Sequence, residues 1–244
     1  MLVPGDLPLA KHIGIVAVSP EGSALCYREI HRRAHALVGD VGHPLVTMHN
    51  ERLDDYIAAL LRDDWHAIGE LLSRSAKLLA SAGADFCITP DNVMQHGVDM
   101  ARAASPIPWM TMTEIVAERV ACDSRRTVGL IGTKMVMYGS TYQTHLGIKG
   151  VKVIAPEAHD AEAIDAIIFR ELIHGIINPE SRRIFIEAIA RMADKGADGV
   201  VLGCSEAPLL ITPEDAPLPA YDAVALLADS AVRFAVGKAA ATAG

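Results

Sequence analysis

Two stretches of the chain share one pattern: residues 83–92 read Gly-Ala-Asp-Phe-Cys-Ile-Thr-Pro-Asp-Asn, and residues 196–205 read Gly-Ala-Asp-Gly-Val-Val-Leu-Gly-Cys-Ser. Each stretch begins with Gly-Ala-Asp, continues as a short apolar run and ends in polar residues. A short apolar run that follows a turn signal predicts a buried strand. The glycine-to-Asp91 spacing equals the glycine-to-Cys204 spacing, so the pair predicts an internal duplication.

The segments before and between these stretches alternate between strand and helix patterns. In the first half, strands are predicted at His12–Val18, Pro44–His49 and Phe86–Thr89, with helical patterns over Ser23–Leu37 and Leu53–Leu79. Strand, helix, strand, helix, strand is the order that builds a parallel sheet with helices on its faces. Residues Pro106–Met110 add a predicted fourth strand, which leads out of the first half.

The second half repeats this order. Strands are predicted at Val128–Ile131, Lys152–Ile154 and Gly199–Leu202, and helices at Ala163–Ile177 and Arg183–Met192. Ile-Gly-Ile at 13–15 and Val-Gly-Leu at 128–130 stand at nearly the same offset as the two Gly-Ala-Asp stretches, which supports the duplication. The predicted fold class is therefore α/β, with two similar halves.

Bulk properties exclude several functions. The 244 residues suffice for one large domain or two smaller ones, and we expect two. A net charge of −8 without clustered Lys and Arg indicates no nucleic-acid partner. No apolar stretch is long enough to span a bilayer, and Met1–Lys11 lacks a signal-peptide pattern, so we expect no membrane association and a cytoplasmic location. Neither a nucleotide-binding glycine motif nor paired metal-ligand spacing occurs, so no cofactor and no metal are predicted.

The four cysteines, Cys26, Cys87, Cys122 and Cys204, stand singly, which indicates neither a disulfide framework nor a zinc site. Cys87 lies inside a predicted strand and Cys122 in a helical stretch, so structural burial is the expected role of both. Cys204 lies on a tight turn after a strand, where backbone N–H groups can favour the thiolate. It is the candidate catalytic residue, and a small buried hydrophobe is the alternative.

Polar residues after the predicted strands are candidates for the same site, because ligands bind at the carboxyl ends of parallel strands. The duplication pairs Asp91 with Cys204, and a carboxylate can move a proton if its pKa is raised. Candidates to bind a carboxylate substrate are Ser19, Asn92, Thr133 and Ser205, and each is equally compatible with a turn or helix-cap role. Arg52 and His174 are candidate partners for a second carboxylate, with surface solvation as the alternative.

At these residues the chain resembles the aspartate/glutamate racemase family over nearly its whole length. The matching motifs are Ser19-Pro-Glu-Gly-Ser with Tyr27, Asp91-Asn92, Ile131-Gly-Thr133 with Tyr142, Glu171-Leu-Ile-His174-Gly175, Glu180-Ser-Arg-Arg183 and Val201-Leu-Gly-Cys-Ser-Glu206. The last two motifs are the most specific.

The resemblance implies two pseudo-symmetric α/β domains, each a short parallel sheet flanked by helices, with the active site in the cleft between them. We place these domains at 1–113 plus 220–244 and at 114–219. It also implies a homodimer and racemisation of acidic amino acids without pyridoxal phosphate or metal. In the family, two cysteines flank the substrate carbon. Cys204 matches the second cysteine, and His174 stands where the family has lysine. Asp91-Asn92-Val93 stands where the family has Cys-Asn-Thr, so the resemblance makes Val93 a candidate substrate-binding residue as well.

The predicted function is therefore racemisation or epimerisation of an acidic amino acid, with Cys204 and Asp91 as an unequal acid/base pair. One alternative is a decarboxylase or cis–trans isomerase of the same superfamily, which needs a single cysteine. A second alternative is a non-catalytic protein that binds a small carboxylate.

Overall fold

The computed structural model describes residues 10–40 and 42–238, so most of the segment on which the signal-peptide prediction rests lies outside the described residues. The chain forms two compact units. Unit 1 contains the described residues up to Pro90, then Met94–Thr111 and the described residues from Leu227 onward, and unit 2 contains Asp91–Val93 and Met112–Leu226. Among the described helices, none is long and apolar enough to span a membrane.

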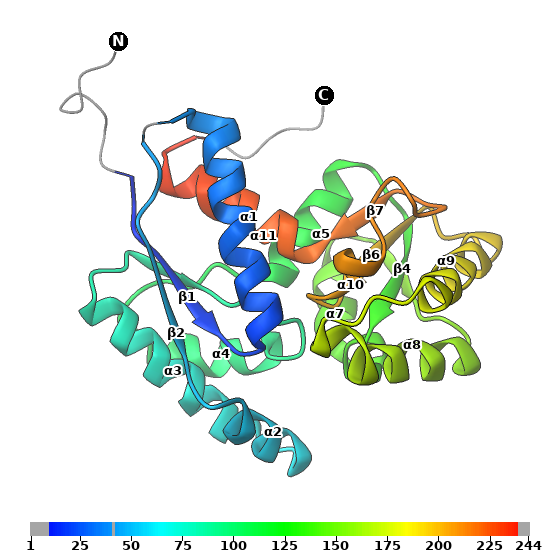
Figure 1. Cartoon of the computed structure of the whole chain (residues 1–244), viewed down its shortest axis with the longest axis horizontal. Coiled ribbons are helices and arrows are strands. Elements are labelled where there is room, and N and C mark those ends of the chain that lie inside the picture. The colour runs from blue at the N-terminus through cyan, green and yellow to red at the C-terminus, as the bar shows by residue number, and fades with distance from the viewer. Residues whose placement is uncertain (1–9, 41, 239–244) are drawn as a thin grey trace. The chain divides into compact units, whose positions relative to one another are not determined.

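Unit 1 contains a parallel three-stranded sheet in the order β2-β1-β3, formed by β1 (Ile13–Ala17), β2 (Val46–Asn50) and β3 (Phe86–Ile88). The central strand β1 is fully buried, as expected for a parallel strand with helices on both faces. The helices of this unit are α1 (Pro20–Val38), α2 (Leu53–Leu61), α3 (Trp65–Ser81), α4 (Gln95–Ala103) and most of α11 (Ala223–Ala235) (Figure 1).

The single helical pattern predicted for Leu53–Leu79 is two helices, α2 and α3. Asp63 between them has a positive φ of 53°, which an uninterrupted helix excludes. Asp64 then caps α3, because its Oδ1 accepts a hydrogen bond from the Ala67 N–H at 3.0 Å. Apolar periodicity continues across the break and therefore did not reveal it.

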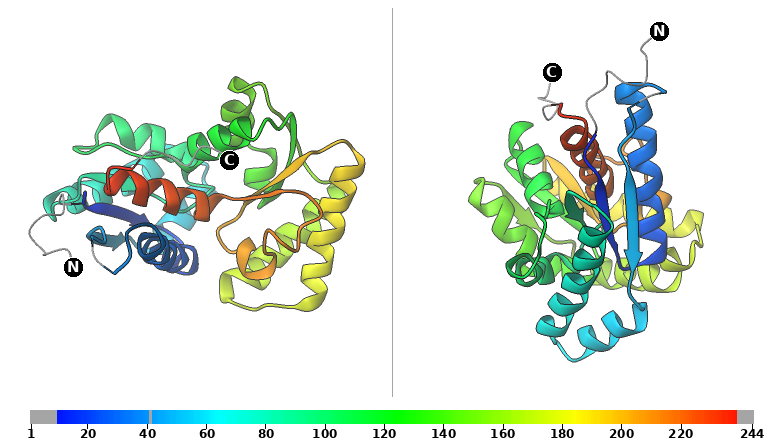
Figure 2. Two further views of the ribbon diagram at one scale, coloured as in Figure 1. Left: turned by 90° about the horizontal axis from the view of Figure 1, so that it is seen from above. Right: turned by 90° about the vertical axis from the view of Figure 1, so that its left-hand side faces the viewer.

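Unit 2 contains a parallel four-stranded sheet in the order β5-β4-β6-β7. Its strands are β4 (Thr127–Gly132), β5 (Lys152–Ile154), β6 (Gly199–Gly203) and β7 (Ala220–Asp222). Its helices are α5 (Met112–Cys122), α6 (Lys134–Tyr138), α7 (Ser140–Ile148), α8 (Ala158–Arg170), the 3-10 turn η1 (Leu172–His174), α9 (Pro179–Asp194) and α10 (Ala207–Leu210). Helices α8 and α9 pack side by side, as Figure 2 shows, and contribute Ile164, Phe185 and Ile189 to the core.

Three expectations for this region need correction. The helix predicted for Ala163–Ile177 begins at Ala158 and is followed by a 3-10 turn that ends at Gly175 with φ 70°. Strand β7 was not predicted, and its pairing with β6 adds residues 220–222 to the unit 2 sheet, whereas the predicted boundary assigns them to the first domain. Cys122 is exposed at the end of α5 and is not a core residue.

The predicted duplication is confirmed in backbone detail. Gly83 and Gly196 both have φ 91°, a conformation that favours glycine. The N–H of Asp85 donates to the His12 carbonyl at 2.8 Å, and the N–H of Asp198 donates to the Thr127 carbonyl at the same distance. Each aspartate side chain in turn accepts from a backbone N–H at the start of the central strand, Asp85 from His12 and Asp198 from Thr127. The two Gly-Ala-Asp stretches are therefore equivalent turns.

The strand predicted for Pro106–Met110 is reduced to one bridge, between Cys87 and Trp109. The Cys87 N–H donates to the Pro108 carbonyl at 2.8 Å, as the Val200 N–H donates to the Pro219 carbonyl at 2.9 Å in unit 2. Each unit therefore adds a segment beside the corresponding strand of its sheet, which is β3 in unit 1 and β6 in unit 2. Only in unit 2 does the pairing extend to a strand.

Candidate functional site

Two polar residues follow directly on paired strand ends in unit 2. Gly132 of β4 is in register with Gly203 of β6, and Thr133 and Cys204 come next in the chain. A Cβ atom on Gly132 would lie 2.6 Å from the Gly203 carbonyl oxygen, so this close approach requires glycine. The two glycines thus bring the Thr133 and Cys204 segments together at the carboxyl edge of the sheet, where parallel α/β proteins bind ligands.

Thr133 and Ser205 carry hydroxyl groups on the two segments that follow β4 and β6. Thr133 is 8% exposed and caps α6, because its Oγ1 accepts from the Val136 N–H at 3.4 Å. Ser205 is 5% exposed. Thr133 therefore has the helix-cap role that the sequence offered as an alternative to substrate binding.

The Cys204 thiol is buried and hydrogen-bonded to a carboxylate. Its Sγ donates to Oε2 of Glu206 at 3.3 Å. Burial, followed by the negative charge of Glu206, raises the pKa of the Cys204 thiol well above its usual range. The backbone N–H groups of Glu206 and Ala207 also bond to the sulfur and act in the opposite direction. Those amides do not make a free thiolate, as the sequence suggested they could, because burial and Glu206 outweigh them.

Glu206 is the residue of this group that the sequence analysis did not select. It belongs to the quoted Cys-Ser-Glu motif, is 4% exposed, and lies before α10. The sequence signal that could have identified Glu206 is a carboxylate two residues after the candidate catalytic cysteine. The pair can hold one proton on sulfur and can receive that proton on oxygen when the thiolate is needed.

Asp91 has a backbone environment like that of Cys204. Its Oδ1 accepts from the Val93 N–H at 3.0 Å, two residues further along the chain. At the equivalent place in the repeat, the N–H of Glu206 bonds to the sulfur of Cys204. Asp91 and Val93 are half-buried. The repeat therefore presents a carboxylate and a thiol on the same local framework.

Asn92 is buried beside Asp91. Its Oδ1 accepts a hydrogen bond from the hydroxyl of Tyr142 on α7 at 2.6 Å. Its Nδ2 has no hydrogen-bond partner among the described residues. Tyr142 was quoted as part of the resemblance but was not selected as a site residue, because a partner fifty positions away in the sequence leaves no local signal.

The remaining predicted residues have other surroundings. Ser19 follows β1 and caps α1, accepting from the Gly22 N–H at 3.2 Å, as Thr133 does after β4. Arg52 precedes α2, is largely exposed and forms an ion pair with Asp54 at 3.7 Å. His174 is exposed at the end of η1, which packs against α10. Ser19 and Arg52 belong to unit 1, and the other seven predicted residues belong to unit 2.

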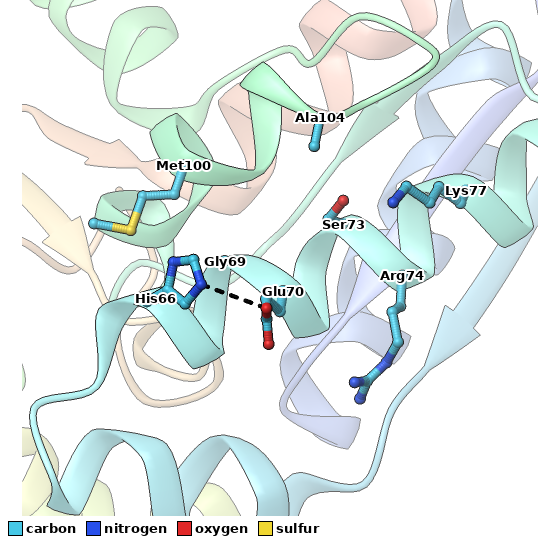
Figure 3. Close-up of a pocket in the computed structure, with 8 residues that line it drawn as sticks. All are labelled: His66, Gly69, Glu70, Ser73, Arg74, Lys77, Met100 and Ala104. Atoms are coloured by element: carbon cyan, nitrogen blue, oxygen red, sulfur yellow. Dashed lines mark ion pairs between the residues drawn. The ribbon is translucent and has the colours of Figure 1, made fainter.

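Figure 3 shows a surface pocket of about 480 Å³ between α3 and α4, where Glu70, Arg74 and Lys77 are among the lining side chains. None of the predicted site residues lines it. Over residues 10–40 and 42–238, no group of three His, Cys, Asp or Glu side chains is placed to hold a metal ion.

Comparison with known proteins gives a consistent result. The model of the Asp/Glu/Hydantoin racemase family matches residues 15–231. A candidate Asp/Glu racemase from Yersinia pestis is similar in structure, with a TM-score of 0.85 and 28% identity over 93% of this chain and 99% of that chain. An aspartate racemase homologue from Pyrococcus horikoshii has a TM-score of 0.82 and 25% identity over 92% and 99%.

A mutant of arylmalonate decarboxylase shares the fold, with a TM-score of 0.61 and 15% identity over 93% of this chain and 94% of that chain.

Proposed function

Because the chain belongs to the Asp/Glu/hydantoin racemase family and is an isomerase of the racemase type, we propose that it racemises or epimerises an acidic amino acid of the aspartate/glutamate kind. The reaction moves a proton at the carbon beside the carboxylate and uses no cofactor. The observation that carries the proposal is the hydrogen bond between the buried Cys204 thiol and Glu206.

In the proposed reaction, Glu206 accepts the proton of the Cys204 thiol, and the resulting thiolate removes the α-proton from one face of the substrate. The electron pair of the broken C–H bond is delocalised into the carboxylate. The carboxylic acid form of Asp91 then delivers a proton to the opposite face. A carboxylate is a weaker base than a thiolate, so proton removal by Cys204 is easier than removal by Asp91. Solvent deuterium therefore enters faster from the enantiomer whose α-proton faces Cys204, and we call this inequality the directional mechanism.

Substrate contacts are proposed for the residues around this pair. Asn92, Val93, Thr133, Ser205 and Ser19 bind the α-carboxylate and amino groups through amide, hydroxyl and backbone donors. Arg52 or His174 pairs with the second carboxylate, since an acidic side chain requires a cationic partner. A homodimer is proposed from the resemblance alone. A cytoplasmic location is proposed from the sequence, in which no apolar stretch is long enough to span a bilayer.

A decarboxylase is the second candidate function, and the protonated state of Cys204 favours it. A single thiol that keeps its proton is suited to protonate one face of an enolate after carbon dioxide leaves. A second thiol is not needed for that reaction, and position 91 is aspartate. The shared fold with arylmalonate decarboxylase is compatible with this candidate.

The test is incubation of D- and L-amino acids and of substituted malonates in deuterated buffer, with NMR detection of exchange at the carbon beside the carboxylate. We expect deuterium to enter aspartate, glutamate or a close relative. Release of carbon dioxide from a malonate would select the decarboxylase instead. Binding of a carboxylate without exchange or carbon dioxide would refute both.

Two cysteine variants make this test specific. Cys204→Ser should lower the exchange rate by about 10²–10⁴-fold, the usual contribution of an acid/base group. Cys122→Ser is the matched control, because its thiol is exposed at the end of α5, and it should exchange like the wild type. Comparable losses in the two variants would contradict the assignment of Cys204. Asp91→Asn should change the exchange of the two enantiomers unequally, and equal rates for both, in wild type and variant, would exclude the directional mechanism.

A further inference from the structure

We infer that Tyr142 is a positioning residue that fixes the orientation of the Asn92 amide, so that its Nδ2 is presented to a carboxylate oxygen of the substrate. The inference rests on the proposed function, which makes Asn92 a substrate ligand, and deepens it by adding a residue on a different helix. It begins from the hydrogen bond between the Tyr142 hydroxyl and Asn92 Oδ1.

The Tyr142 hydroxyl is held as a hydrogen-bond donor. The side chain is 1% exposed, and α7, which carries it, packs against α5. Burial, followed by the negative charge of Asp222, raises the pKa of the Tyr142 hydroxyl above its usual range. The hydroxyl therefore keeps its proton, and it donates that proton to Asn92 Oδ1 over 2.6 Å.

This donor selects one of the two orientations of the Asn92 amide. An asparagine side chain presents an acceptor oxygen at one end and two N–H donors at the other. With Oδ1 bonded to Tyr142, the N–H groups must point to the opposite side. A rotated amide would lose the bond that the tyrosine hydroxyl donates and would turn Nδ2 toward the tyrosine oxygen. The orientation in which Tyr142 donates to Oδ1 is therefore the one that leaves Nδ2 free for a ligand.

The Nδ2 group lacks the partner that its burial requires. Asn92 is 6% exposed, and its Nδ2 is without a hydrogen bond among the described residues. Buried amide groups are paired in most proteins because an unpaired donor is costly. Asn92 adjoins Asp91, which the duplication equates with Cys204, so the unpaired group lies one residue from a proposed proton carrier. A carboxylate oxygen on the substrate would satisfy it with a charge-assisted hydrogen bond.

The test is a double-mutant cycle between Tyr142→Phe and Asn92→Ala, read by deuterium exchange and by calorimetric binding of succinate, an unreactive dicarboxylate. Tyr142→Phe removes only the hydroxyl and should raise KM and the Kd for succinate by about tenfold, with a smaller effect on kcat. Tyr138→Phe, on α6 and 54% exposed, is the matched control and should leave both unchanged. In the Asn92→Ala background, Tyr142→Phe should have no further effect on KM.

Several outcomes would overturn the inference. Additive effects of the two substitutions on KM would show that Tyr142 acts on general packing rather than through Asn92. If Tyr142→Phe lowers thermal stability but leaves KM and Kd unchanged, Tyr142 has only a structural role. Succinate binding without exchange in the wild type would refute the proposed function alone, and the cycle would then be read from Kd. If the wild type neither exchanges any substrate nor binds succinate, both proposals fail.

Discussion

Replacement of Cys87 by alanine should change how the stability of the protein depends on pH. Cys87 lies in β3 and is fully buried, and burial raises the pKa of its thiol from the ordinary value of 9.0 to about 12. Below pH 9 the thiol is protonated in both the folded and the unfolded chain, so its contribution to stability is complete. Above pH 9 the unfolded chain loses this proton while the folded chain keeps it, and stability falls until the pH reaches about 12.

The size of the effect follows from the pKa difference of about three. One pKa unit corresponds to about 1.4 kcal/mol, so this thiol alone lowers the free energy of unfolding by about 1.4 kcal/mol for each pH unit above 9. At pH 10 the accumulated loss is about 1.4 kcal/mol. Cys87→Ala should therefore be less stable than the wild type at pH 7.5, by about 1 kcal/mol for a small buried truncation, and should recover this deficit by pH 10.

The assay is urea unfolding followed by circular dichroism at pH 7.5 and pH 10, for the wild type, Cys87→Ala and Cys122→Ala. Other groups titrate in this range, so the relevant quantity is the difference between variant and wild type at each pH. Cys122→Ala is the control for removal of a thiol outside the core, because Cys122 is exposed at the end of α5. A Cys87→Ala difference that is equal at the two pH values would refute the claim that burial holds this thiol protonated.

Three further predictions concern the site and the repeat. Glu206→Gln should slow exchange by about 10²-fold, measured by NMR, because the amide cannot accept the thiol proton; an unchanged rate would count against Glu206. Asp91→Cys should bring the exchange rates of the two enantiomers closer together, because position 91 would then present a thiolate, which is a stronger base than a carboxylate; an unchanged ratio of the two rates would count against position 91. Asp198→Ala should lower the free energy of unfolding, measured in urea, by about 1–3 kcal/mol, because the N–H groups of residues 126 and 127 lose their acceptor. Asp85→Ala should cost less, because only one N–H group loses its acceptor; a larger loss in Asp85→Ala would contradict this account.

Much of the fold followed from repeated local patterns. Gly83 and Gly196 need the same positive φ, and the aspartates after them close the same turn, so each half carried its own copy of the information. The central strands were predicted well because parallel strands covered on both faces are uninterrupted apolar runs. Strand β7 is three residues long and only its middle residue is buried, so it left no such run.

The candidate site was predicted only as far as its parts are local. Cys204 and Asp91 follow strands at matching positions and could be found by spacing. The bond between Tyr142 and Asn92 joins distant segments through the packing of α7, which periodicity does not report. The state of the Cys204 thiol depends on burial and on the position of Glu206, so it could not be assigned from the composition of the turn.

The repeat also separates what the backbone specifies from what the side chain specifies. An N–H two residues further along the chain bonds to the side chain of Asp91 and to that of Cys204, so the same framework holds a carboxylate in one copy and a thiol in the other. A change between these two side chains therefore leaves the turn intact while changing the strength of the base it presents. Glu206 stands two positions after Cys204, and valine stands two positions after Asp91. The residue at this interval can therefore take the proton of the thiol but not that of the Asp91 carboxyl group. The two copies are thus unequal in base strength and in the residue that follows at this interval, which is the physical basis of the unequal deuterium exchange of the two enantiomers that we propose.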